Sequence, residues 1–505
     1  MLSIYASTEL HAEIRSILQQ EDRLEELVQI IDHLSIRPVP NALNCMVQAE
    51  GIRSMIDWQN QQAPYLLPEY LPLHPDILLS WCFARLGNYE KVQAYLAKDY
   101  PTLYLEFDFI NRLNQGLPVD PAELISDYSP FDEYRLMHNQ AVVRHYHPQP
   151  DPKTIDQARY FYLEALESAP NDEYRAFSAW HFALLLIDLG ELEDAIRVLR
   201  AAIHFALTED ARIELRYALC QALMQQLHPP YDPDLLEEIK SGLWAVQAHY
   251  KAQDRPVEQA FVLTDMGVIA NYCESWSESL GYFNQAQTSF EAAELTEMLG
   301  QLHYRKGTLL FTWAQQGNPQ FFKGAIESYQ KALQTFSREA APEVYAEIQH
   351  HLGIIYSEIP DEVKKKGLWA AISASAFQEA LDIFRKESHP YEYAMVCNHF
   401  GNALTKYPEA KLTDNMEKAL FYFQEALSIR SAEAYPLERC LSLLNSLEAH
   451  WHLGMPEDRL DEARFQQMVD AAQEVLDISP DENLRALAQD QLDKLEQLKQ
   501  AYAAS

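Results

Sequence analysis

The most constraining feature of this 505-residue chain is a recurring pair of small residues. In each pair, a Gly or Ala in one apolar segment is followed, 19 to 27 residues later, by an Ala in a second segment. The pairs are Ala141 with Ala165, Ala183 with Ala202, Gly267 with Ala286, Gly307 with Ala332, Gly353 with Ala380, and Gly401 with Ala426. Small residues let two helices approach closely, so each pair predicts one helical hairpin stacked on the next. The sequence therefore predicts an all-α solenoid of antiparallel helix pairs.

The strength of this pattern varies along the chain and suggests three regions. Residues 1–130 carry a weaker period, although Ile17, Leu24, Leu27 and Ile30 have helical spacing. We expect this region to be degenerate helix, serving as an N-terminal cap. Residues 131–465 are predicted to form the repeat array, and residues 466–505 to form polar capping helices, because a last repeat has no neighbour to cover it.

The charge of the chain limits its partners. With 75 acidic and 40 basic residues, the formal net charge is −35. Affinity for phosphate backbones comes largely from clustered Lys and Arg, so nucleic acid is disfavoured as the main ligand, and so is an anionic membrane surface. A basic protein partner is compatible with this charge, but strong acidity is also a simple means of staying soluble.

Cysteine usage and the start of the chain indicate a cytoplasmic protein. The six cysteines are scattered without a CxxC pair, so we expect each to behave as a small buried hydrophobe in a reducing compartment. The N-terminal residues show no basic start followed by an apolar run, which predicts no signal peptide. No stretch approaches the roughly 18 apolar residues of a membrane span.

Several segments resemble tetratricopeptide (TPR) repeats. They are LGIIY at 352–356, FGNAL at 400–404 and LGELEDA at 189–195, with Ala-Leu in FQEALDI and FQEALSI. The units with longer gaps also resemble bacterial arrays that accompany CHAT caspase-like proteases. The resemblance implies a right-handed superhelix whose first helices line a concave groove that captures peptides or protein surfaces.

Carrying the groove positions over from the resemblance gives a set of mostly polar candidates for partner binding. These are Thr264, Asp265, Asn271, Tyr304, Arg305, Thr308, His350, His351, Asn398, His399, Asn402 and Lys406. Asn and Arg suit the capture of an extended peptide, because both offer hydrogen-bond donors. The alternative is that these are ordinary polar residues on a solvated face.

Motifs of catalysis are absent from the sequence. There is no G-x-x-x-x-G-K-[ST] loop, G-x-S-x-G elbow, H-E-x-x-H helix or paired Cys/His zinc spacing. We therefore expect no enzyme activity, no metal and no cofactor. The leading hypothesis is a non-catalytic scaffold or adaptor that binds a protein or peptide. The alternative is a peptide or small-ligand sensor that gates a separate effector, such as a CHAT-type protease in trans.

Overall fold

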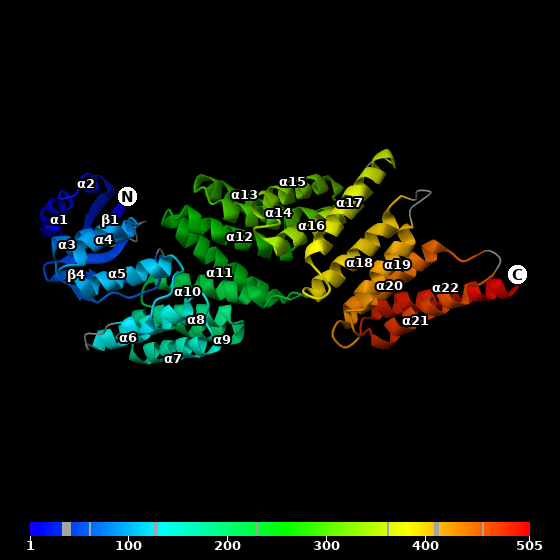
Figure 1. The fold of residues 1–505 in the computed structure, drawn as a ribbon, viewed down its shortest axis with the longest axis horizontal. Coiled ribbons are helices and arrows are strands. Elements are labelled where there is room, and N and C mark those ends of the chain that lie inside the picture. The colour runs from blue at the N-terminus through cyan, green and yellow to red at the C-terminus, as the bar shows by residue number, and fades with distance from the viewer. Residues whose placement is uncertain are drawn as a thin grey trace. The chain divides into compact units, whose positions relative to one another are not determined.

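The computed structural model describes residues 1–32, 42–59, 62–124, 130–228, 230–360, 363–408, 414–456 and 459–504. The chain divides into two compact units, Met1–Ser275 (unit 1) and Trp276–Ser505 (unit 2). In Figure 1 unit 1 runs from blue to green and unit 2 from green to red. Paired helices occur in both units. The predicted limits of the three regions stay a prediction.

Unit 1 opens with a five-stranded mixed sheet of strand order β2-β1-β3-β4-β5. Its strands are β1 (Leu2–Ala6), β2 (Val28–Asp32), β3 (Ala42–Gln48), β4 (Gly51–Ser54) and β5 (Tyr70–Leu71). The central strand β1 is parallel to β2 and β3, whereas β4 and β5 continue the sheet in antiparallel pairing.

The prediction of a purely helical N-terminal region is wrong for the sheet residues. Helices do form at α1 (His11–Leu18) and α2 (Leu24–Leu27), but the apolar residues on either side form β1 and β2. The cause is that short apolar runs buried in a parallel sheet carry no period that separates them from buried helix. Ile4 and Val47 are fully buried on the side of the sheet that meets α3.

The rest of unit 1 is helical, as the pattern predicts. Its remaining helices are η1 (Thr8–Leu10), α3 (Pro75–Arg85), α4 (Tyr89–Leu96), α5 (Pro101–Asn114), η3 (Pro121–Glu123), α6 (Pro130–His145), α7 (Pro152–Ser168), α8 (Asp172–Asp188), α9 (Leu192–Phe205), α10 (Glu209–Gln225), α11 (Pro233–Ala252) and α12 (Pro256–Tyr272). Antiparallel neighbours include α6 with α7 and α8 with α9 (Figure 1).

A buried polar cluster attaches the segment between β4 and β5, at Pro64 and Leu66, to the helix α6. His138 Nε2 lies 2.8 Å from the carbonyl oxygen of Pro64. The amide of Asn139 both accepts from the Leu66 N–H and donates to its carbonyl, at 2.8 and 2.9 Å. These bonds satisfy loop backbone groups that burial would otherwise leave unpaired.

Unit 2 is helical in its described residues. Its helices are α13 (Trp276–Ala292), α14 (Thr296–Gln315), η4 (Pro319–Phe321), α15 (Phe322–Thr335), α16 (Pro342–Glu358), α17 (Val363–Ile383), α18 (Pro390–Lys406), α19 (Asn415–Leu427), α20 (Pro436–Leu453), α21 (Glu462–Ile478) and α22 (Glu482–Ala504). The pairs are α14 with α15, α16 with α17, α18 with α19, and α20 with α21. The predicted helical repeat fold is thereby confirmed.

Three glycines of unit 2 have the role that the sequence predicts for small residues. A Cβ built on Gly401 would lie 2.6 Å from the ring of Phe423, three residues before Ala426. The same geometry recurs where Gly307 meets Tyr329 and where Gly353 meets Phe377. Each glycine therefore receives the face of an aromatic ring from the second helix. The remaining pair, Gly267 with Ala286, spans the two units and stays a prediction.

We predict that Gly401→Ala destabilises unit 2 by about 1–2 kcal/mol. Overpacking against Phe423 costs about 1–3 kcal/mol, which outweighs the gain of up to about 1 kcal/mol from a better helix former. The matched control is Gly281→Ala on α13, where no atom lies within 4 Å of the added Cβ. Urea denaturation followed by circular dichroism should show opposite shifts for the two variants; a stabilised Gly401→Ala would contradict the packing argument.

The remaining sequence predictions for compartment have mixed outcomes. The cysteines are free thiols, and five of them are buried as expected, but Cys273 is exposed at the end of α12. Within the described ranges, none of the helices combines the length and the apolar character of a membrane-crossing segment.

Candidate partner-binding row and a pocket beside the sheet

The predicted residues of unit 2 lie on the first helices of successive pairs, and we call them the first-helix row. They are Tyr304, Arg305 and Thr308 on α14, His350 and His351 on α16, and Asn398, His399, Asn402 and Lys406 on α18. The helix α18 packs against both α16 and α20, so the row crosses adjacent repeats.

Aromatic rings join the α14 and α16 parts of the row. The rings of Tyr304 and His351 are stacked, with centroids 6.2 Å apart and planes 20° apart. Both surround Tyr329, whose hydroxyl lies 3.1 Å from His351 Nδ1 and 2.9 Å from the hydroxyl of Thr308. Burial lowers the pKa of His351 to about 4, so its ring is neutral near pH 7. These side chains form one connected cluster of uncharged polar and aromatic groups.

Two histidines connect α16 with α18. His350 Nε2 lies 2.7 Å from His399 Nδ1, and the two rings stack at 4.9 Å. Burial lowers the pKa of His399 to about 4 and holds that of His350 well below its usual value. The other nitrogen of His350, Nδ1, is buried without a hydrogen-bond partner in the described part of the chain. A hydrogen bond between the two rings requires an unprotonated nitrogen on the accepting ring, so at least one ring is neutral, which agrees with this environment.

Asn398 is an internal connector rather than an exposed binding group. It is buried, and its Oδ1 accepts hydrogen bonds from Ser442 Oγ at 3.1 Å and Asn445 Nδ2 at 3.3 Å, both on α20. Its position in the first helix was predicted correctly, but its amide oxygen already has partners within the protein.

The accessible part of the row is smaller than the sequence suggests. Arg305 is exposed, and within the described residues it forms no ion pair. Lys406 is also exposed, but its Nζ lies 3.1 Å from Glu358. Asn402 and Tyr304 are half-buried. A partner would therefore meet Arg305, Tyr304 and Asn402 first.

The three candidates of unit 1 lie on α12 and are described separately. The hydroxyl of Thr264 donates to the carbonyl of Ala260 in its own helix. Asp265 accepts a hydrogen bond from the hydroxyl of Tyr217 at 2.9 Å, so its carboxylate already has a partner within unit 1. The amide oxygen of Asn271 is buried without a hydrogen-bond partner in the described ranges. How α12 is placed relative to the row of unit 2 stays a prediction.

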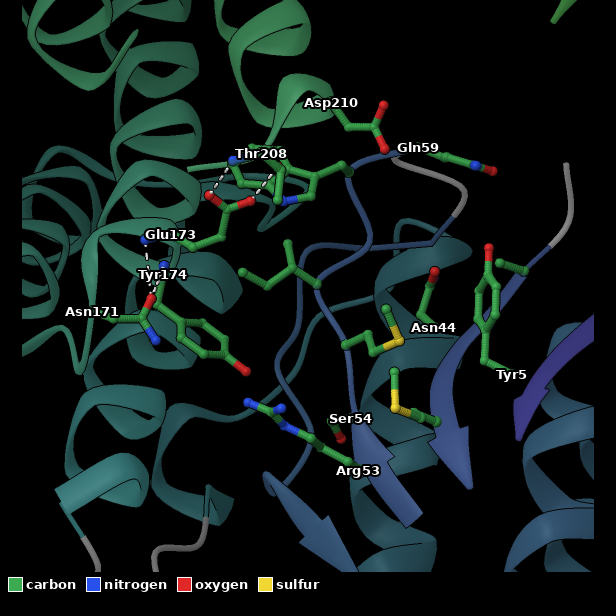
Figure 2. A pocket seen from close by; sticks show the side chains of 15 residues that line it. Tyr5, Asn44, Arg53, Ser54, Gln59, Asn171, Glu173, Tyr174, Thr208 and Asp210 are labelled. Atoms are coloured by element: carbon green, nitrogen blue, oxygen red, sulfur yellow. Dashed lines mark hydrogen bonds between the residues drawn. The ribbon is translucent and has the colours of Figure 1, made fainter. Parts of the chain in front are cut away.

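Unit 1 also contains a half-open pocket of about 330 Å³ that the sequence did not reveal. We call it the sheet pocket. Its floor is one face of the sheet and its other side is built by the segment after β4 and by α8 (Figure 2). The residues used below are Tyr5, Asn44, Met46, Arg53, Trp58 and Tyr174. It was missed because the strands that carry its floor were read as helix.

The rim of the sheet pocket is formed by the starts of two helices, and their backbone donors are satisfied. Asn171 Oδ1 caps α8 by accepting from the N–H groups of Glu173 and Tyr174. The carboxylate of Glu173 in turn accepts from the N–H groups of Leu207 and Thr208 and from the Thr208 hydroxyl (Figure 2). The helix starts therefore need no external anion.

No protein-family profile and no curated protein sequence matches this chain. Solved structures do match. A signal transduction ATPase with a TPR sensor from Pyrococcus horikoshii has a TM-score of 0.51 at 15% identity, with 85% of this chain and 61% of that chain covered. The apo form of RapI has a TM-score of 0.46 at 11% identity, covering 70% of this chain and 96% of that chain. A Rap protein complexed with competence and sporulation factor has a TM-score of 0.40 at 13% identity, over 70% and 96%.

The paired helices, the aromatic rings that pack on small residues, and the similarity to the Pyrococcus structure define the class of fold. The chain has a TPR-type helical repeat fold. In unit 1 a five-stranded sheet precedes the repeats, and the sheet pocket lies between this sheet and the starts of α8 and α10. This likeness concerns the fold alone, since fold does not determine function.

Proposed function

We propose that this protein is a non-catalytic scaffold or adaptor that binds a protein or peptide partner on the first-helix row of unit 2. The observation that carries the proposal is the continuous line of aromatic and polar side chains from Tyr304 through His351 and His350 to His399. Their mutual contacts fix their orientations before a partner arrives, and the buried His350 supports the row from within. A surface that is already ordered loses less entropy on binding.

The accessible members of the row give the partner its expected chemistry. Arg305 offers a guanidinium fork, Asn402 a side-chain amide, and Tyr304 a partly exposed ring, a combination that suits an extended backbone with an aromatic or apolar anchor. The net charge of −35 favours a partner that is basic outside this contact, because long-range attraction speeds encounter.

A partner pull-down tests this proposal. We expect a protein retained by the wild type to be lost by Arg305→Glu/Asn402→Ala, because both changes remove accessible donors without touching the buried connector Asn398. The control is Lys323→Glu, an exposed residue of the second helix α15 with the same change of charge. A partner retained by both variants would place the interface elsewhere.

A second candidate function is a ligand sensor, and the sheet pocket is the observation that favours it. In this alternative, a small ligand changes unit 1 and thereby gates a separate effector, for which a CHAT-type protease in trans remains our proposal. Ligand at a hundredfold excess over Kd should stabilise the folded state by about 2.7 kcal/mol. A scaffold without such a site would show no ligand-dependent shift.

A further inference from the structure

We propose that the sheet pocket of unit 1 binds a small aromatic carboxylate, with Arg53 holding the carboxylate and the aromatic side chains enclosing the ring. The inference gives a chemical class to the ligand of the sensor alternative. It does not depend on the first-helix row, so its failure would leave the scaffold proposal untouched.

The floor of the pocket is a cross-strand row with an unusual composition for a covered sheet face. Strand pairing aligns Tyr5 with Met46, Met46 with Arg53, and Arg53 with Tyr70. The neighbouring row, which includes Ala6, Val47 and Ile52, is fully buried and apolar. One face of the sheet is thus ordinary core, whereas the other presents rings, a thioether and a guanidinium. Flat apolar surfaces of this kind accommodate a planar ring.

The side of the pocket opposite the floor is also aromatic. Trp58 and Tyr174 are both buried, and Trp58 is held in place by stacking on Trp180 at 5.7 Å. A volume of about 330 Å³ lies within the range of small-molecule sites. Aromatic groups on two sides and a volume of this size favour a ligand with one or two fused rings.

The polar groups inside the pocket select an anion. In Figure 2 the hydroxyl of Tyr174 and the guanidinium of Arg53 point toward the same part of the cavity. Burial raises the pKa of Tyr174 to about 12; the carboxylate of Glu69 raises it as well, whereas Arg53 lowers it. Arg53 Nη2 lies 3.5 Å from Oε1 of Glu69, a carboxylate outside the lining of the pocket. A ligand carboxylate would accept from both donors without displacing a close bidentate pair.

Asn44 adds an independent observation, because it is locally strained. It lies in β3 with φ of 55°, at the point where the register between β1 and β3 shifts. A bulge of this kind re-aims a side chain, and strained residues cluster at functional sites. The Asn44 side chain lines the pocket, and within the described residues its amide makes no hydrogen bond. It is therefore a third donor available to a bound carboxylate.

The acidic residues at the rim decide between an anionic and a cationic ligand. The carboxylate of Glu173 is already saturated by donors of the α10 start, and Asp210 lies 2.9 Å from His249 Nε2. Arg53 and Asn44, by contrast, have donors to offer. The geometry therefore points to the anion rather than to an amine.

The test measures binding of indole-3-acetate to the full chain by isothermal titration calorimetry. We expect saturable binding, with indole-3-acetamide at least about tenfold weaker because it lacks the charge that Arg53 recognises. Arg53→Gln should remove this preference. Asn44→Gly should weaken the binding of indole-3-acetate, while glycine keeps the left-handed backbone conformation. The control Arg23→Gln changes an exposed arginine that lies outside the pocket.

Each other outcome would overturn the proposal. If the wild type bound indole-3-acetate and indole-3-acetamide with equal affinity, Arg53 would not recognise the carboxylate. Tighter binding of tryptamine than of indole-3-acetate would show a cation site. No binding of any of these indoles at millimolar concentration would show that the cavity is not a site for this class of ligand.

Discussion

Replacing Arg135 with Met is expected to lower the free energy of unfolding of unit 1 by about 3–5 kcal/mol. Arg135 is buried on α6, and its Nη1 lies 2.8 Å from the carboxylate of Glu106 on α5. Its Nε lies 3.1 Å from Asp132, and its Nη1 also donates to the carbonyl of Leu66. The other oxygen of Glu106 is buried without a hydrogen-bond partner in the described ranges, so removing Arg135 leaves a buried carboxylate that is supported only by the hydroxyl of Tyr65.

The matched control for this prediction is the double variant Arg135→Met/Glu106→Gln. Replacing both members of a buried ion pair avoids the unpaired charge, so we expect the double variant to be more stable than Arg135→Met alone. Urea denaturation monitored by circular dichroism gives both free energies. A loss below about 1 kcal/mol for Arg135→Met, or an equal loss for the double variant, would show that the cost does not come from the stranded charge.

Acidification is expected to destabilise unit 2 through its buried histidines. Burial lowers the pKa of His351 and His399 to about 4 and holds that of His350 well below its usual value. In the unfolded chain a histidine titrates near 6.5. Between these values the unfolded state binds more protons than the folded state. The stabilisation is therefore present above about pH 6.5 and is lost as the pH falls towards about 4.

Two histidines with a pKa of about 4 would together lower the free energy of unfolding by about 2–4 kcal/mol between about pH 7 and about pH 5. Other charges act on the same cluster. Lys406 and Arg430 lower the pKa of His399 further, whereas burial raises the pKa of Glu347, which acts in the opposite direction. We expect the histidines to dominate, because several of them titrate against one carboxylate.

Urea midpoints measured across this pH range test the prediction. His399→Asn should reduce the slope of stability against pH, whereas His452→Asn, at an exposed position of α20, should leave it unchanged. A wild-type stability that is flat from about pH 7 to about pH 5 would contradict the argument. So would a slope unaffected by His399→Asn.

The candidate residues show where sequence reasoning succeeded and where it could not. The repeat pattern placed Tyr304, His351 and His399 on successive first helices. In the structure Tyr304 stacks on His351, and His399 contacts His350, which is next to His351 in the sequence. It could not show that Asn398 is buried against α20, because the pattern describes one helix face and not what covers it. The sheet pocket was beyond reach, since its floor depends on pairing between strands far apart in the chain.

The sequence by itself determined the helical repeat. Paired small residues determine how closely two helices approach. In the structure an aromatic ring packs against each of Gly307, Gly353 and Gly401. These are local rules, acting between neighbours in the chain. Only the tertiary structure decided that the segments of β1 to β5 pair into a sheet, and which polar groups stay accessible. Strand pairing and burial are set by distant partners, and a short apolar run is compatible with either helix or strand until those partners are in place.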